Sequence, residues 1–520
     1  MRTLAKITAL ATIVVALAGW AGAQEQSSGE APPPRPNILF AISDDQSWRH
    51  VSALGAAELS TPAFDRVARE GILFENAYCA APSCAPSRAA ILTGQDIWRL
   101  EEGGLLFGAL PRKFPIFTQA LAEAGYRVAH TAKGYDPANK TDPRYWNHPL
   151  LEEYDSIRTP EVPGFLDVDY AANFGAFLED RAASEDPDQP FFFWYGGKEP
   201  HREYDEGAGR RAGKDLSRIE VPGFLPDDSI TRSDLADYYY EIEHFDTHLG
   251  RMLDALEAAG ELDNTLVIVT SDNGMPFPYA KTTLYEHGIH MPLAVRWGDR
   301  VAGGRRVADF VNFIDFAPTF LELAGAPTPA AATGRSLTDL LYGGGSGFVG
   351  QPERHRVVTG WERHTWCRPG GLTYPSRQIR EDNWTYIVNY EPDRWPGGDP
   401  DYDSPHQGIF GDIDAGSLRE WMIANRDAPA VTPHFARCFG KRPRHELYDL
   451  ARDPDQLRNL ADDPSYRAER DHLAAALDDY LRRTGDPRVD GHDPWVDYPY
   501  YFPGYDTRHR RPVGEREPAH

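Results

Sequence analysis

The chain of 520 residues carries a formal net charge of -25 at pH 7, and 41% of its residues are hydrophobic. This composition allows a large folded core and more than one domain. The acidic balance excludes nucleic acid as a partner, because phosphate binding needs a basic surface. The four cysteines are too few for a disulfide scaffold, and the sequence leaves open whether Cys367 and Cys438 pair.

Residues 1–23 have the pattern of a cleaved signal peptide. Arg2 and Lys6 precede the apolar run ITALATIVVALA, and small residues at positions 21–23 follow it. The run is shorter than the roughly 20 residues of a membrane-spanning helix, so a permanent anchor is the weaker interpretation. We expect an exported protein, periplasmic or extracellular and without a membrane span, whose mature chain begins with a proline-rich connector over residues 24–36.

Apolar, strand-like runs alternate with helical stretches from residue 37 onward. This alternation predicts an α/β fold in which helices sandwich a large, mostly parallel sheet. Four of the runs end in polar side chains: NILFAIS in Asp44-Asp45, YRVAHTA in Lys133, PFFFWYGG in Lys198-Glu199-Pro200-His201, and NTLVIVTS in Asp272-Asn273-Gly274. Open α/β sheets bind ligands beyond the carboxyl ends of their strands, so these groups are expected to converge on one crevice.

The same patterns divide the mature chain into a large domain over residues 37–345 and a smaller C-terminal α+β domain over residues 346–490. Helices are expected at about residues 62–70, 87–92, 117–124 and 233–259, and the apolar run at 308–325 closes the large domain. Glycines gather at residues 342–350 and indicate the boundary. Strand-like runs at 354–361 and 383–390 and a helical run at 463–483 follow, whereas residues 491–520 stay unassigned.

The acidic turns after two of these strands suggest a metal site. Asp44, Asp45, Asp272 and Asn273 offer oxygen ligands only, which suits a hard divalent cation. Calcium accepts a larger and less regular oxygen shell than magnesium, so one calcium ion is preferred. Taken singly, Asp-Asp and Asp-Asn-Gly are also ordinary turn or helix-cap sequences. Their joint position at strand ends favours the metal.

Basic residues near the same strand ends suggest an anion site. Arg88, Lys133, His201 and Lys281 are each unremarkable if they lie on a solvated face. Their positions in the sequence, however, allow them to face the crevice. Fixed cations around a metal would hold a tetrahedral oxyanion and stabilise charge that develops on it.

The segment CAPSRAAILTG, residues 84–94, resembles the Cys-x-Pro-Ser-Arg signature of the type I sulfatases in the alkaline-phosphatase-like superfamily. The similarity extends through SDNG and KTTLYEHGIHMPL to ELYDLARDPDQLRNLA near residue 450. Within this family the chain is most similar to the heparan N-sulfatase group, through EPHR, SDNGMPFP and TYPSRQ. A buried cysteine that precedes a Pro-Ser helix start for packing alone is the competing interpretation.

The resemblance implies hydrolysis of sulfate esters or sulfamates on a sulfated saccharide. It implies that a formylglycine-generating enzyme oxidises Cys84 to formylglycine during export, and that Asp44, Asp45, Asp272, Asn273 and the modified residue bind calcium. Arg88 would hold these groups in place. Lys133 and Lys281 would neutralise sulfate oxygens, and His201 would protonate the leaving group.

Three points remain open in the sequence. Many sulfatases have Gly-Lys-x-His around the lysine, whereas this chain has Ala-Lys-Gly-Tyr, which leaves the role of Tyr135 undefined. His364 and Arg377 are candidate substrate contacts from the smaller domain, with a surface or interdomain role as the alternative. A phosphonate or phosphate ester hydrolase of the same superfamily, or a non-catalytic binder of sulfated glycans, are the alternative functions.

Overall fold

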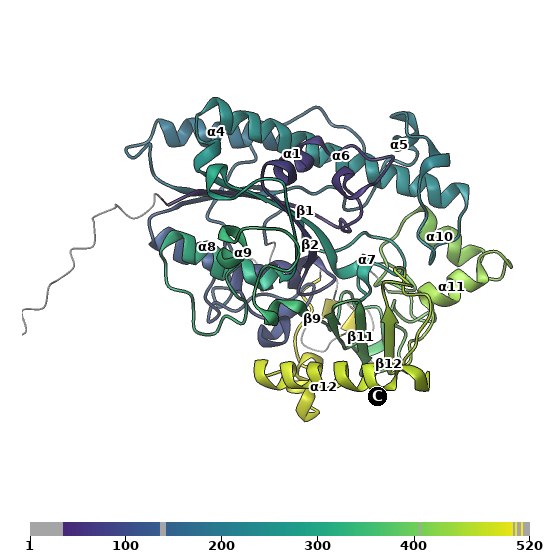
Figure 1. The fold of residues 1–520 in the computed structure, drawn as a ribbon. Helices are drawn as coiled ribbons and strands as arrows, with labels where there is room; N and C mark the ends of the chain where they lie inside the picture. Colours follow the sequence, from purple (N-terminus) through teal and green to yellow (C-terminus); the bar gives the residue numbers. More distant parts are fainter. Residues whose placement is uncertain (1–34, 136–141, 405–406, 503–504, 507–510, 513–520) are drawn as a thin grey trace, which may run out of the picture. The chain divides into compact units, whose positions relative to one another are not determined.

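The computed structural model describes residues 35–135, 142–404, 407–502, 505–506 and 511–512 (Figure 1). The predicted signal peptide and most of the proline-rich connector lie outside this part of the chain. Within it, no helix combines the length and the apolar character that crossing a membrane requires. All four cysteines are described and none is in a disulfide, so Cys367 and Cys438 do not pair.

An eight-stranded sheet organises the first part of the chain, in the order β4-β3-β5-β1-β6-β7-β2-β8. Neighbouring strands run parallel, except that β7 is antiparallel to β6 and β2. The α/β class with a mostly parallel sheet is thereby confirmed. The strands are β1 Asn37–Ser43, β2 Ile72–Tyr78, β3 Arg127–Ala132, β4 Glu152–Glu153, β5 Phe191–Gly196, β6 Thr265–Ser271, β7 His290–Arg296 and β8 Arg305–Asn312.

Helices cover both faces of this sheet, because its central strands are apolar on both sides. On β1, Leu39 and Ala41 pack toward α1 Pro62–Glu70, α4 Tyr170–Ala182 and α6 Ser229–Ala258, which Figure 1 shows along one face. Phe40 belongs to the core of the other face, with residues of α2 Cys84–Thr93, α3 Phe117–Glu123 and α8 Phe316–Ala324. Helix α6 begins four residues before the predicted start, because the Asp228 side chain accepts the Ile230 amide proton.

A separate four-stranded antiparallel sheet, in the order β12-β11-β10-β9, follows the glycine-rich segment. Its strands are β9 Arg356–Trp361, β10 Ser376–Glu381, β11 Trp384–Asn389 and β12 His445–Asp449, and α12 Arg467–Thr484 packs against β10 and β11. The proposed domain boundary falls between α9 Thr338–Tyr342 and β9. Further short helices are α5 Ala208–Arg211, α7 Glu286–Ile289, α10 Ser417–Ala424 and α11 Thr432–Phe439. Strands β13 Tyr505–Asp506 and β14 Arg511–Pro512 form a two-stranded antiparallel sheet.

Residues 495–501, which the sequence analysis left unassigned, pack against earlier parts of the chain. Trp495 and Tyr500 are buried, and the ring of Tyr500 lies 5.2 Å from that of Phe107. The Tyr501 amide donates to the Phe107 carbonyl at 2.9 Å. Residues 495–501 therefore support a loop that lies some 400 positions earlier in the sequence.

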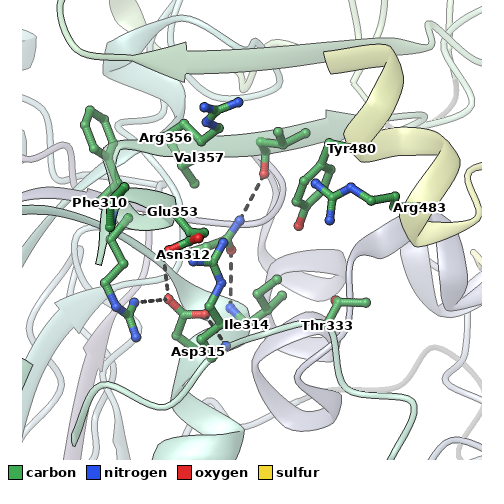
Figure 2. Close-up of a pocket in the computed structure, with 14 residues that line it drawn as sticks. Phe310, Asn312, Ile314, Asp315, Thr333, Glu353, Arg356, Val357, Tyr480 and Arg483 are labelled. Carbon is green, nitrogen blue, oxygen red and sulfur yellow. Dashed lines mark hydrogen bonds and ion pairs between the residues drawn. The ribbon is translucent and has the colours of Figure 1, made fainter. Parts of the chain in front are cut away.

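Polar contacts join the two sheets where β8 meets β9. Asn312 donates from Nδ2 to the Val358 carbonyl at 2.9 Å, and Arg354 pairs with Asp315 across 3.3 Å. These residues line a cavity of about 320 Å³. Figure 2 shows Asn312 and Asp315 in this region, together with Tyr480 of α12. The junction is thus fixed by buried hydrogen-bonded groups as well as by apolar contact.

Four arginines line this junction cavity, and three of them pair with acids. Arg356 pairs with Glu381 at 3.2 Å, and Arg483 pairs with Asp479 at 2.9 Å. Arg354 is shared between Asp315 and Asp339. The positive charge of these three side chains is therefore opposed within the protein.

Candidate active site

Three buried carboxylates meet at the carboxyl end of the large sheet. The register of β1 and β6 aligns Ser43 with Ser271, so the residues that follow, Asp44 and Asp272, lie side by side. Oxygens of Asp44, Asp45 and Asp272 all lie within 4.8 Å of one another, and none of these residues is more than 1% exposed. Such a cluster of like charges needs positive charge close by.

The donor set of this cluster fits a hard cation. Asn273 joins it by donating from Nδ2 to Asp45 Oδ1 at 2.7 Å. Among the described residues, no hydrogen-bond partner is found for two buried oxygens, Asp44 Oδ1 and Asn273 Oδ1. Buried acceptors are rarely left unsatisfied, and oxygen-only groups are the ligands that calcium and magnesium prefer. The residues present therefore suit a divalent cation of this class.

The protonation of the cluster responds to burial and to its cationic neighbours. Burial raises the pKa of Asp45 to about 7 and that of Asp272 to about 6. Burial also acts to raise the pKa of Asp44, but Lys133, His201 and Arg88 outweigh it and hold that pKa below its usual value. Binding a cation would favour the ionised form of all three carboxylates.

Each carboxylate of the cluster has its own cation. The three ion pairs are Arg88 Nε with Asp272 Oδ2 at 2.7 Å, Lys281 Nζ with Asp45 Oδ2 at 2.7 Å, and Lys133 with Asp44. Arg88 also donates to the Lys133 carbonyl at 2.6 Å, which fixes the loop after β3. The structure thus brings together the basic side chains that the sequence analysis placed on separate strand ends.

Cys84 is the first residue of α2 and lies close to the charged residues of these ion pairs. Arg88 follows it by one helical turn, so both side chains project from the same face of the helix. Cys84 is buried, and burial raises the pKa of its thiol even though Lys133 and Lys281 oppose the rise. An unmodified Cys84 is therefore a poor thiolate nucleophile in this setting.

His201 follows β5 and presents one ring nitrogen to the cluster. Its Nδ1 lies 2.5 Å from the Arg202 carbonyl, so this nitrogen carries the hydrogen. Its Nε2 lies 3.9 Å from Asp45 Oδ2. Burial and the charge of Lys281 lower the pKa of His201 to about 4. A bound anion would oppose this shift and favour the protonated ring.

A cavity of about 470 Å³ opens onto these groups. His364 contributes to its wall, and the His364 Nδ1 lies 2.9 Å from Ser83 Oγ. The full lining is Cys84, Ala85, Arg88, Leu106, Phe107, Lys133, His201, Arg202, Glu203, Lys281, His364, Gln407, Asp414 and Ala415. The predicted basic residues and His364 therefore share one cavity.

Asp414 is the main residue of the site that the sequence analysis missed. Its Oδ2 accepts a hydrogen bond from Lys281 at 2.8 Å, and its Oδ1 accepts one from Gln407 at 3.1 Å. Asp414 lies in an irregular segment that follows no strand of the large sheet, so no strand-end pattern singled it out. The same is true of Leu106 and Phe107.

The structure does not bring Arg377 to this cavity. Arg377 lies on β10 with no exposed surface, and it pairs with Glu362 at 2.8 Å and Asp486 at 2.6 Å. Its guanidinium also lies over the Trp98 ring. Arg377 therefore does not contact a ligand in this cavity, contrary to the expectation from the sequence. Its ion pairs with two buried acids give it a structural role instead.

Tyr135 is not among the residues that line the cavity. Its buried hydroxyl accepts the Leu110 amide proton at 2.9 Å. This bond ties the loop after β3 to the segment that carries Leu106 and Phe107. The contact assigns Tyr135 to support of the cavity wall.

Comparison with known proteins places these features in a family context. The sulfatase family profile matches residues 36–326. The chain is 28% identical to human N-sulphoglucosamine sulphohydrolase over 502 residues, covering 88% of this chain and 91% of the relative. It is 24% identical to an ulvan-active sulfatase of Formosa agariphila over 483 residues, covering 87% and 76%.

Solved structures share the fold. A structure in complex with its substrate D-glucosamine-2-N,6-O-disulfate matches with a TM-score of 0.63 and 20% identity, covering 88% of this chain and 100% of that one. A phosphonate monoester hydrolase of Agrobacterium radiobacter matches with a TM-score of 0.59 and 20% identity, covering 88% and 97%. The profile spans more than half of the chain and includes Cys84, the carboxylate cluster and its three cations, and on this ground the chain belongs to the sulfatase family.

Proposed function

We propose that this protein hydrolyses sulfate esters or sulfamates of a sulfated saccharide, with residue 84 as formylglycine and with bound calcium. The observation that carries the proposal is the position of Cys84 at the start of α2, on a cavity shared with Lys133 and Lys281 and above the carboxylate cluster. The cations suit a sulfo group, and the cluster suits a hard metal ion.

The saccharide class is supported by the names of the relatives. One acts on N-sulphoglucosamine and another on ulvan, and the chain covers most of the length of both. The cavity of about 470 Å³ is in the range of pockets that hold a small molecule. A monosaccharide unit with its sulfo group is therefore a suitable ligand.

The chemistry explains why a cysteine precursor is useful at position 84. One hydroxyl of a hydrated aldehyde attacks sulfur, and the bond from sulfur to the leaving oxygen or nitrogen breaks. His201 gives the leaving atom a proton from Nε2. The second hydroxyl then gives its proton to water, the bond between the side-chain carbon and the sulfate oxygen breaks, and sulfate departs as the aldehyde re-forms. A serine or cysteine would lack this second step.

Asp44, Asp45, Asp272 and Asn273 would hold the calcium ion together with residue 84. When bound, calcium lowers the proton affinity of the nucleophile and orients the sulfo group. Lys133 and Lys281 neutralise sulfate oxygens from the cavity wall, and Arg88 fixes Asp272 and the loop of Lys133. Export past a formylglycine-generating enzyme would supply the oxidation of Cys84, consistent with the expected signal peptide.

Mass spectrometry of the peptide that contains residue 84 tests the proposal, together with sulfate release. Protein produced with a formylglycine-generating enzyme should show the aldehyde or its hydrate and should release sulfate from an aryl sulfate and from sulfated sugars. Cys84→Ser should fold and release none. An active preparation with an unmodified thiol throughout would refute the mechanism, and faster turnover of a matched aryl phosphonate would favour the phosphonate hydrolase alternative.

A further inference from the structure

Asp414 lies close to His201, the residue proposed above to protonate the leaving atom. An oxygen of Asp414, an oxygen of Asp45 and a ring nitrogen of His201 all lie within 4.8 Å of one another. Asp414 is 7% exposed and lines the cavity. A leaving atom that takes its proton from His201 would therefore be released next to a buried carboxylate.

The Oδ1 atom of Asp414 can accept a further hydrogen bond from a ligand. Lys281 occupies Oδ2 at 2.8 Å, while Oδ1 accepts only the Gln407 bond at 3.1 Å among the described residues. His364 Nε2 lies 4.0 Å from this Oδ1, which is too long for a hydrogen bond. A carboxylate oxygen accepts two hydrogen bonds, so Oδ1 can take one more from a group in the cavity.

The charge of Asp414 distinguishes the two kinds of sulfo linkage. When the N–S bond of a sulfamate breaks, the electron pair stays on nitrogen and the sulfo group passes to the nucleophile oxygen. The nitrogen takes one proton from His201 to become an amine, and a second proton from water gives an ammonium ion. When an O–S bond breaks, one proton gives a neutral alcohol. A neighbouring carboxylate stabilises the cationic product far more than the neutral one.

We propose that Asp414 is a specificity-determining residue that selects sulfo groups carried on nitrogen, by accepting a hydrogen bond from the departing amine. This inference rests on the proposed sulfatase function and identifies the leaving group of that reaction as an amine. Glu203, an exposed carboxylate on the same cavity, adds to the negative potential on this side.

The test compares N-sulfoglucosamine with glucose 2-sulfate, which differ only in the leaving atom, in wild-type enzyme and in Asp414→Asn. Wild-type kcat/KM should be higher for the sulfamate. Asp414→Asn should lose about 10- to 100-fold on the sulfamate, the effect of removing a hydrogen bond between charged groups, and about threefold or less on the ester. Asp414→Glu should recover part of the loss. Asp427→Asn, an exposed acid further along the same C-terminal part, is the matched control and should change neither substrate.

A binding measurement separates this role from support of Lys281. In Cys84→Ser protein, titration with glucosamine and with glucose should show tighter binding of the amine, and Asp414→Asn should abolish the difference. Equal losses on both substrates, or an unchanged preference, would overturn the proposal and leave the sulfatase function intact. Absence of sulfate release from every sulfated substrate, with residue 84 converted, would overturn both.

Discussion

Arg88 and Asp272 form an ion pair that solvent does not reach, with 2.7 Å between Nε and Oδ2 and side-chain exposures of 1% and 0%. Arg88 comes from the helix that carries Cys84, and Asp272 follows the central strand β6. The pair therefore ties the helix of Cys84 to the carboxylate cluster. Substituting Arg88 tests how far the cluster depends on its paired cations.

Arg88→Ala should destabilise the fold by about 3–5 kcal/mol, because it leaves Asp272 buried without its partner. Chemical denaturation of the purified variant measures the change in the free energy of unfolding. Arg158→Ala provides the control, since Arg158 and Asp167 form an exposed pair that should contribute less than about 1 kcal/mol. Equal small effects for both variants would contradict the structural assignment of Arg88.

Calcium should raise the melting temperature of the wild-type protein, because an ion that binds only the folded state stabilises it. At 100 times the dissociation constant the gain is about 2.7 kcal/mol. Asp272→Asn should lose both the bound metal, measured by elemental analysis, and most of this gain. Asp254→Asn, an exposed acid on α6, should retain both. Full metal content in Asp272→Asn would remove Asp272 from the ligand set.

His201→Ala should affect substrates according to their leaving groups. Loss of a general acid costs typically 100- to 10,000-fold, and this loss should appear in kcat for a sulfated sugar. An aryl sulfate with a weakly basic phenolate leaving group needs little protonation and should lose much less. Parallel kinetics on the two substrates measure the contrast, and the same loss on both would point to a role for His201 in binding the sulfo group.

Arg377→Ala should unfold the junction of β10 with the C-terminal segment and not weaken substrate binding. Buried Asp486 would lose its ion-pair partner at a cost of about 3–5 kcal/mol, whereas Glu362 would keep its pair with Arg488 at 2.6 Å. The comparison is with His364→Ala, whose side chain lines the cavity and should raise KM for a sugar substrate. A rise of KM in folded, stable Arg377→Ala would restore the original expectation of a substrate contact.

Asp246 should make the protein less stable as the pH rises. Burial raises its pKa from 3.8 to about 7, despite hydrogen bonds from the amides of Ala63 and Phe64. The folded state thus binds the proton more tightly than the unfolded chain. This contribution is complete below about pH 4 and is lost as the pH rises through about 7, by as much as about 4 kcal/mol.

The asparagine of Asp246→Asn does not titrate, so the free energy of unfolding of this variant should change less with pH. Urea unfolding at pH 5 and pH 8, in the wild type and in Asp246→Asn, isolates the contribution of this residue from those of other buried acids. Asp254→Asn again serves as a control. An identical change in the free energy of unfolding between the two pH values in all three proteins would refute the assignment.

Strand periodicity was enough to place the centre of the site. The apolar run before Asp44 and the run before Asp272 were both long enough to be buried strands, and parallel pairing then requires their ends to meet. The same logic located Lys133, which directly follows β3, and the loop after β5 that carries His201. The hydrogen-bonded register of the strands fixes where these loops begin, and the sequence pattern of a strand predicts that point well.

Strand periodicity could not predict the cavity residues that come from the C-terminal part of the chain. Asp414 and Gln407 lie in an irregular segment, and their approach to Lys281 depends on how the smaller sheet packs. Arg377 was misplaced for the same reason, because a lone arginine in a sequence does not reveal the buried acids that surround it. Contacts between segments far apart in the chain leave no local periodic signal.

The contact of Tyr500 and Tyr501 with Phe107 makes one wall of the cavity depend on residues that are remote in the sequence. Cys84, the carboxylate cluster and its three cations all lie before residue 290. A chain cut after residue 490 would keep all of these residues and lose the contacts that support Phe107. Truncation there would therefore alter the shape of the cavity without removing any of its charged groups.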